Sequence, residues 1–417
     1  MSKNNAAAKL YRLTLVSVIA ASFMFHLAIL WESRGKIAAG YGDFIIFYTG
    51  AQIINDGKAK ELFKVGTQNA YQAKFEVPQL EWPLPFNHAP YELFLFLPLA
   101  HFSYPMAHAI WSGMNLLLLA FVLQWLLSYV HSPHNLFIVA SVLAWFPTME
   151  ALRLGQDSIL SAALLLAVFA ALKRQHDGWA GFFLALGLYK PQLVLPMVGV
   201  FLVARRWRSL IVFGVTGVVL ATISLAMVGQ QGIFDLASIL KSMGNYAFVV
   251  RPALMPNVRG LSNALLHGEN FRAMAPTVVI SLALYALCLY LWCGKFDVVS
   301  SGFDLKFSLM LVTTVLISYH LYAHDLFPLS LSMILLFRYV SSADAHRPAL
   351  SNLFYGLVLI FLLPLVPRYL IESRLFWWWV LPVLLLYLIL SVEILKRRWL
   401  EEAASGTQSS HRSRRSG

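Results

Sequence analysis

Asp43 has the residue type and the position to act as a base. It stands between Gly42 and Phe44, just after the first long apolar segment of a chain that has few ionisable groups. A carboxylate at the mouth of a membrane can take a proton from a substrate hydroxyl group at the lipid surface. The competing interpretation is a solvated loop acid, so the other polar residues must decide between the two.

Lys190 lies between Tyr189 and Pro191 in an otherwise apolar stretch. A charge near the bilayer centre costs about 2.5–3.5 kcal/mol on insertion scales, so such a residue needs an explanation. We predict that Lys190 binds a phosphate group in a cavity that opens to the outside. The alternative is a lysine whose amine reaches the membrane interface along its apolar stem.

A second dense group of polar residues runs from Tyr319 to Asp325. His320 and His324 are four residues apart, so they share a helix face if the helix continues. Asp325 could complete a metal site, but no further acidic pair stands nearby in the sequence. We therefore predict that the histidines bind a phosphate or sugar oxygen. For His324, a structural histidine at the membrane interface is the competing interpretation.

Four further residues are candidates for substrate binding. Arg251 and Arg259 lie in a long loop, and the planar fork of an arginine fits a phosphate group, although a loop arginine is often merely solvated. Gln156 separates two apolar runs and could bond a sugar hydroxyl group, but a plain polar turn explains it equally well. His88 opens a membrane segment and is predicted to line the cavity wall.

The composition places these residues in a membrane protein. Hydrophobic residues make up 59% of the chain and charged residues 12%, about half of the charged fraction that is usual in soluble proteins. Many apolar runs approach the length that a helix needs to cross a bilayer, and strand-like alternation is absent. We predict an all-α polytopic protein, a helical bundle of about 12 transmembrane helices.

Two connections between the predicted spans are long, at 32–89 and 229–274. The distribution of Lys and Arg places both loops outside and both termini in the cytoplasm. The span at 178–204 fits only if it is broken at Lys190–Pro191, in which case 88–101 is re-entrant, and Pro191 favours the break. Both loops contain short amphipathic pieces, such as 44–55, that could lie in the interface plane.

Several classes of function are disfavoured. No phosphate-cradling loop, dinucleotide fingerprint or Asp-x-Asp pair is present, which argues against a soluble nucleotide donor. The net charge of +12 does not indicate a nucleic-acid partner, because basic residues gather beside helix ends. We predict one transmembrane domain over 1–395, followed by a basic, disordered cytoplasmic tail over 396–417 that lies against anionic lipid.

The motifs, in their order, resemble glycosyltransferase family 87, the polytopic GT-C group that includes polyprenol-phosphate-mannose-dependent mannosyltransferases. The resemblance extends over nearly the whole chain, to about Leu395. It is carried by Gly42-Asp43-Phe44 with Phe47-Tyr48 and Gly50-Ala51, Pro90 to Leu99, Leu154-Gly155-Gln156, Leu186-Gly187 with Lys190-Pro191-Gln192, Asn257 with Arg259-Gly260-Leu261, and Tyr319-His320 with His324-Asp325.

The resemblance implies a GT-C-like bundle in a bacterial plasma (inner) membrane. It implies inverting transfer of a sugar, mannose or another hexose, from a polyprenyl-phosphate donor to a lipid or glycan acceptor at the outer face, with Asp43 as the base. Lys190, Arg259 and His320 would stabilise the leaving phosphate. No cofactor and no metal are expected. The alternatives are a transporter or flippase of lipid-linked sugars, which does not need Asp43 as a base, and a noncatalytic assembly scaffold.

Overall fold

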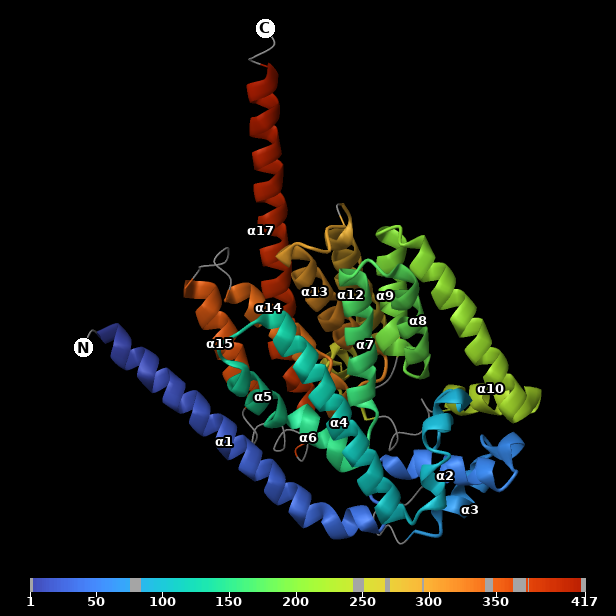
Figure 1. The fold of residues 1–417 in the computed structure, drawn as a ribbon. Coiled ribbons are helices and arrows are strands. Elements are labelled where there is room, and N and C mark those ends of the chain that lie inside the picture. Colours follow the sequence, from blue (N-terminus) through green and yellow to red (C-terminus); the bar gives the residue numbers. More distant parts are fainter. Residues whose placement is uncertain are drawn as a thin grey trace.

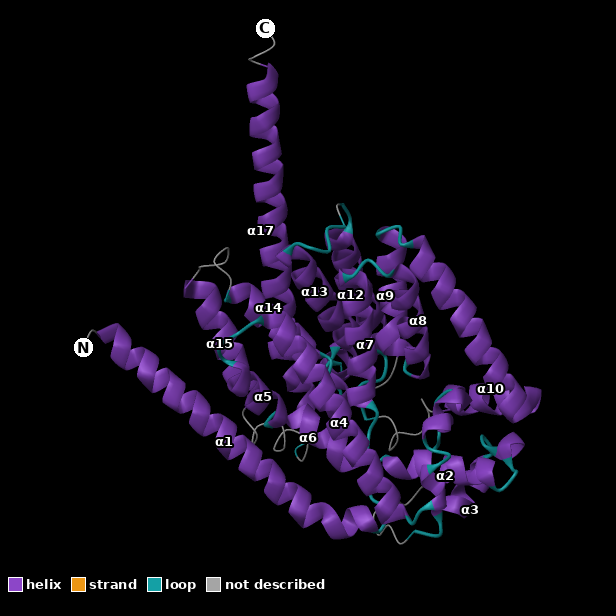
Figure 2. Ribbon diagram, viewed as in Figure 1, coloured by secondary structure: helices purple, strands orange, loops and turns teal. Residues whose placement is uncertain are grey.

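In the part of the chain that the structure describes, apolar segments without strand-type alternation form helices, because a backbone in lipid must satisfy its own hydrogen bonds. The computed structural model is a helical bundle, and no strand occurs among the described residues (Figures 1 and 2). The structure describes residues 3–75, 84–242, 251–266, 271–294, 296–341, 348–362, 373 and 375–413. The prediction of an all-α protein is confirmed for these residues.

Among the described residues, five helices are long and apolar enough to cross a membrane, and a sixth span arises if the bent pair α5 and α6 is counted as one. The bend between these two helices is 50°. The predicted total of about 12 is not confirmed by this count. The candidate spans lie in α1 (Lys3–Ala38), α4 (Tyr104–Val130), α10 (Trp207–Ser242), α12 (Phe271–Trp292) and α17 (Val380–Ser413), and the bent pair is α5 (Asn135–Leu143) with α6 (Phe146–Leu154).

Shorter helices fill the interior between these spans. Almost every side chain of α13 (Ser301–Ile317) is buried, so this helix lies in the middle of the apolar core. The other short helices are α2 (Phe44–Asn55), α3 (Val65–Gln72), α7 (Ser158–Lys173), α8 (Asp177–Leu186), α9 (Pro191–Val203), α11 (Val258–Leu265), α14 (Leu329–Val340) and α15 (Pro348–Leu362). Short 3-10 turns are η1 (Ala59–Glu61), η2 (Pro90–Leu95), η3 (Leu99–His101), η4 (Gly187–Tyr189), η6 (Pro252–Leu254), η7 (Ala323–Leu326) and η9 (Phe376–Trp379).

The predicted break at Lys190 is confirmed. Helix α8 ends at Leu186, the single turn η4 follows, and α9 begins at Pro191. Pro191 occupies the first position of α9, where its missing N–H is not needed. The segment 88–101, in contrast, contains no α-helix and consists of the two turns η2 and η3.

The two predicted loops are more structured than the sequence indicated. Helix α2 forms as expected, but nine of its 12 residues are buried, so it packs against the bundle rather than presenting one face to an interface. Helix α10 continues past the start of the second loop through a kink at Gly229. Helix α17 continues to Ser413, through much of the segment assigned to a disordered tail. Residues 76–83, 243–250, 267–270 and 414–417 of these loops and of the tail lie outside the described residues.

One buried charge cluster joins four helices at the N-terminal end of α13. The Asp304 side chain is buried, and its carboxylate lies 2.6 Å from Lys173 Nζ at the end of α7. Arg338 of α14 approaches the same carboxylate to 2.5 Å, and the Tyr129 hydroxyl of α4 donates to it at 2.9 Å.

Figure 1 shows α2 and α3 at the bottom of the bundle, whereas α17 leaves it at the top.

Candidate active site

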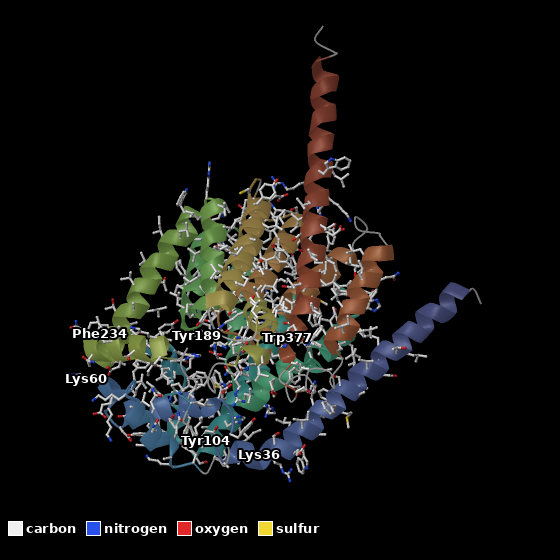
Figure 3. The ribbon with its side chains drawn as sticks, turned by 180° about the vertical axis from the view of Figure 1, so that it is seen from behind. Lys36, Lys60, Tyr104, Tyr189, Phe234 and Trp377 are labelled. Carbon is white, nitrogen blue, oxygen red and sulfur yellow. The ribbon has the colours of Figure 1, made fainter. Side chains whose placement is uncertain are left out.

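Six of the eight predicted site residues line one cavity of about 610 Å³. The cavity receives side chains from the start of α2, the segment before η2, the N-terminus of α7, the η4–α9 junction and the segment 318–326. Tyr189, labelled in Figure 3, also lines it. Leucines from η4, α9 and α10 form an apolar part of the wall. The six residues are Asp43, His88, Gln156, Lys190, His320 and His324.

Asp43 precedes α2, and its carboxylate is held by Gln156. The Gln156 side-chain amide donates to Asp43 Oδ2 at 2.6 Å. Gly155 ends α6 in the left-handed conformation with φ 67°, and a Cβ at this position would lie 2.5 Å from Phe44 Cβ. The absence of a side chain at Gly155 therefore lets α6 approach α2 closely enough for Gln156 to reach Asp43.

Lys190 is an internal counterion. Its side chain is only 3% exposed, and Nζ lies 2.5 Å from Asp157 Oδ1 and 2.7 Å from Asp325 Oδ1. This burial disagrees with a lysine that reaches the membrane interface. The ammonium balances two carboxylates and also lines the cavity. Asp157 was not among the predicted site residues, although its position next to Gln156 in a polar break was a usable signal.

His88 makes a second buried pair on the same wall. Its Nδ1 lies 2.6 Å from Glu92 Oε2 and 3.9 Å from Asp157 Oδ2. Glu92 was also not predicted as a site residue, because an acid four residues after a histidine is a common pattern. Burial raises the pKa of Glu92, which lies outside the candidate spans, to about 8, against the lowering effect of the adjacent His88.

The two histidines of the segment 318–326 lie on the cavity but not on one continuous helix. Helix α13 ends at Ile317, and η7 begins only at Ala323, so the expected shared α-helix face is wrong. His324 Nε2 lies 3.4 Å from Asp325 Oδ2. Burial lowers the pKa of His320, which lies in the connecting segment, to about 4. His320 is therefore a neutral imidazole near pH 7.

The two predicted arginines do not line the cavity. Arg259 is buried, donates to the Tyr319 carbonyl oxygen at 2.8 Å and places its guanidinium 3.9 Å from the centre of the Tyr319 ring. Tyr319 itself lines the cavity, so Arg259 supports the wall from behind. Arg251 is exposed, and its backbone N–H donates to the Tyr322 hydroxyl at 2.9 Å.

Metal-ligand geometry occurs at a place that the sequence did not suggest. In the described part of the chain, one group of three side chains could hold an ion, and it consists of His88, Glu92 and Asp157. One ligand atom of each lies within 4.8 Å of the others. The segment around His320, which the sequence offered as a minor metal candidate, does not form such a group.

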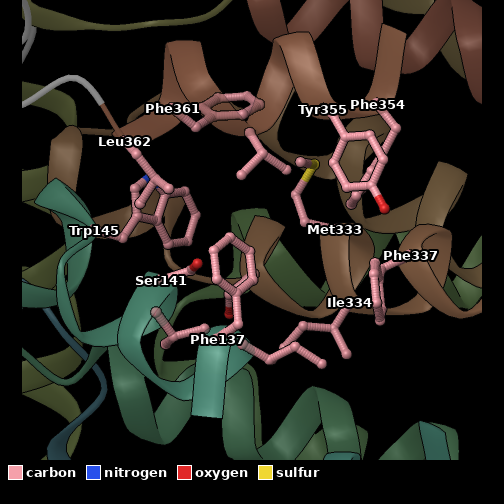
Figure 4. Close-up of a pocket in the computed structure, with 14 residues that line it drawn as sticks. Phe137, Ser141, Trp145, Met333, Ile334, Phe337, Phe354, Tyr355, Phe361 and Leu362 are labelled. Atoms are coloured by element: carbon pink, nitrogen blue, oxygen red, sulfur yellow. The ribbon is translucent and has the colours of Figure 1, made fainter. Parts of the chain in front are cut away.

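A second cavity lacks charged groups that could act in catalysis. It measures about 90 Å³ and lies between α5, α14 and α15 (Figure 4). Aromatic and aliphatic side chains such as Phe137, Met333 and Phe361 surround it, and none of its lining residues is charged. The polar cavity around Asp43, in contrast, carries the charged and hydrogen-bonding groups that catalysis needs.

Comparison with known proteins gives a family and no individual relative. Residues 86–318 match Glycosyltransferase family 87. No curated protein and no solved structure matches the chain. The matched range is more than half of the 417 residues and includes His88, Gln156, Lys190 and Arg259, whereas Asp43 and the histidines at 320 and 324 lie outside it. On this match, together with the apolar helices that can cross a membrane, the chain belongs to glycosyltransferase family 87.

Proposed function

We propose that this membrane glycosyltransferase transfers a hexose from a polyprenyl-phosphate donor to a hydroxyl group of a lipid or glycan acceptor. The observation that carries the proposal is one cavity that holds two carboxylates, a lysine and three histidines beside apolar walls. The reaction takes place at the outer face of a bacterial plasma membrane. The shorter apolar helices add to the candidate spans, so that the chain makes about 12 passages with both termini in the cytoplasm.

Asp43 acts as the base. Its carboxylate takes the proton of the acceptor hydroxyl group while that oxygen attacks the anomeric carbon of the sugar. The bond from this carbon to the donor phosphate breaks on the opposite side, and the phosphate leaves with the electron pair, which inverts the configuration. Gln156 donates to one carboxylate oxygen of Asp43 and so fixes the direction in which the base faces.

Other residues of the same cavity stabilise the leaving phosphate. Lys190 contributes an ammonium group whose position is set by Asp157 and Asp325. His320 is neutral and donates a hydrogen bond, and His324 lies beside it on the cavity. Donors aimed at the place where negative charge develops supply the largest part of such catalysis.

The prenyl chain of the donor lies along the apolar part of the wall. Leu188, Leu195, Leu236 and Leu240 line the cavity where η4, α9 and α10 meet. Much of α10 faces outward with exposed apolar side chains, as a helix surrounded by lipid does. A lipid chain therefore enters between these helices from the bilayer, and the sugar end reaches Asp43.

The test is a transfer assay with purified protein and a panel of polyprenyl-phosphate sugars, followed by mass spectrometry. The Asp43→Asn variant is expected to keep donor binding and to lose product formation. Asp235→Asn is the matched control, because Asp235 lies on α10 outside the cavity lining and accepts a hydrogen bond from the neighbouring Gln231. Full turnover by Asp43→Asn would refute the assignment of the base.

The competing function is transport of lipid-linked sugars. It is examined with the same protein in sealed vesicles, where a labelled lipid-linked sugar is placed on one side. Substrate crossing without a new glycosidic bond, unaffected by Asp43→Asn, would support transport and contradict the proposed transfer. Product formation without crossing would support the transferase.

A further inference from the structure

The cluster His88, Glu92 and Asp157 has polar atoms that the protein leaves without partners. Glu92 is 2% exposed and Asp157 is fully buried, yet Glu92 Oε1 and Asp157 Oδ2 have no hydrogen-bond donor among the described residues. Asp157 Oδ1 differs, because Lys190 Nζ lies 2.5 Å from it. A buried polar atom without a partner costs about 1–3 kcal/mol, and more if it is charged.

The carboxyl groups around the cluster outnumber its permanently charged cation. Lys190 is shared by Asp157 and Asp325, and Glu92 adds a third buried carboxylate on the same wall. Three carboxyl groups therefore share one ammonium, with the imidazoles of His88 and His324 at the two ends of the row. An uncompensated charge in a buried site is strongly destabilising, so either a bound cation or a proton on one of these groups completes the balance there.

The spacing suits a divalent ion. The ligand atoms of the three side chains lie within 4.8 Å of one another. Bonds from such ions to oxygen or nitrogen are about 2.0–2.2 Å long, so two ligand atoms on opposite sides of an ion are about 4–4.4 Å apart. An imidazole with two carboxylates is a ligand set for divalent transition-metal ions such as Mn²⁺, Fe²⁺ and Zn²⁺.

We propose that His88, Glu92 and Asp157 bind a divalent cation in the wall of the catalytic cavity. Asp157 would then hold the ion through its Oδ2 atom and pair with Lys190 through its Oδ1 atom. Because His88 and Lys190 also line the cavity, the ion lies close to the place where a phosphate group would bind. This last step rests on the proposed function, whereas binding of the ion does not. The ion was not expected from the sequence, because Glu92 and Asp157 are far apart along the chain.

Binding is measured with Mn²⁺ alone, on purified full-length protein that has been treated with a chelator. Loss of the free-ion signal in electron paramagnetic resonance gives the stoichiometry, and thermal unfolding gives the stabilisation by bound ion. We expect one Mn²⁺ per chain and a rise in the unfolding temperature. Glu92→Gln and His88→Gln should each weaken binding at least about tenfold, because loss of groups that merely orient a metal ligand already costs about 10–100-fold.

Glu150→Gln is the control, since Glu150 is paired with Arg153 and lies outside the cluster. Folding of each variant is compared by thermal unfolding without the ion. The proposal is overturned if the natural protein binds no Mn²⁺, or if Glu92→Gln and His88→Gln bind it as well as Glu150→Gln does. Absence of binding, with higher stability of Glu92→Gln, would mean that a proton shared between Glu92 and Asp157 takes the place of the ion.

Failure of this proposal is distinguishable from failure of the proposed function. Mn²⁺ binding needs no sugar donor and is read without any turnover. A protein that binds Mn²⁺ at the cluster but forms no glycosidic product would leave the metal site standing and remove the transferase. A protein that transfers sugar and binds no Mn²⁺ would support the transferase and refute the metal site.

Discussion

Replacing Lys190 by Met removes the shared counterion of two buried carboxylates. The methionine side chain has nearly the length of the lysine stem, so the change deletes the charge and little packing. In the structure, Lys190 Nζ lies 2.5 Å from Asp157 and 2.7 Å from Asp325, and none of the three side chains is more than 5% exposed. Water therefore cannot take over the role of the lysine without opening the site.

The expected cost follows from this burial. Removal of one partner from a buried ion pair destabilises a protein by about 3–5 kcal/mol, because the remaining charge has no compensation. The triple variant Lys190→Met with Asp157→Asn and Asp325→Asn leaves no buried charge behind in this group. Neutral replacement of a whole buried pair is often harmless to stability. The triple variant should therefore recover most of the lost stability.

The assay is chemical unfolding in detergent micelles, followed by tryptophan fluorescence, together with donor binding on the folded fraction. We expect the single variant to be much less stable than the natural protein, the triple variant to be close to it, and both to lose transfer. A single variant with natural stability, or a triple variant no more stable than the single one, would refute the role of Lys190 as a buried counterion. Transfer by the triple variant would remove Lys190 from the phosphate site.

Three further perturbations test other parts of the structure. Gly155→Ala should cost about 1–3 kcal/mol of stability and reduce transfer, because residue 155 has positive φ and an added Cβ meets Phe44. The control Gly214→Ala, whose Cβ meets nothing within 4 Å, should leave stability and transfer unchanged. Equal transfer rates in the two variants would contradict the close approach of α6 and α2. Burial lowers the pKa of His320 to about 4, below its unfolded value of about 6.5. Between these two pH values the unfolded chain binds more protons than the folded chain does. Stability should therefore fall as the pH is lowered from 7 to 4. Thermal unfolding against pH should show a smaller acid loss in His320→Gln, and an unchanged loss would speak against a buried neutral imidazole. Asp304→Asn should destabilise the protein by about 3–5 kcal/mol, since it leaves Lys173 and Arg338 facing each other. The transfer rate per folded molecule should not change. A changed transfer rate at saturating donor would show that this remote end of the bundle influences the cavity.

The sequence predicted residues more successfully than it predicted partners. Lys190 stood out because a charge in an apolar stretch is expensive, but its partner Asp325 lies 135 residues away. Which carboxylate meets which cation depends on how helices pack, and a linear pattern does not contain that. Gln156 and Asp43 were both singled out, whereas their hydrogen bond depends on the close approach allowed by Gly155.

The helix count shows a second limit of hydropathy. Helix α7 is apolar because other helices surround it, whereas α10 is apolar with most of its surface exposed. Both give long apolar runs, so the sequence cannot separate a helix that faces lipid from one that faces protein. The break at Pro191 was predictable because proline acts locally on the backbone. The end of α13 before His320 was not, since no proline or glycine marks it.

The charges at the two ends of α7 have a consequence for how the protein is made. Asp157 precedes this helix and Lys173 closes it, and their partners Lys190 and Asp304 follow later in the chain. When α7 leaves the ribosome, neither charge has its counterion, and each is costly in lipid. We expect α7 to wait beside the insertion machinery until α13 has been synthesised. Chains that stop before Asp304 should therefore be removed by membrane proteases, so assembly of this fold is completed from its C-terminal half.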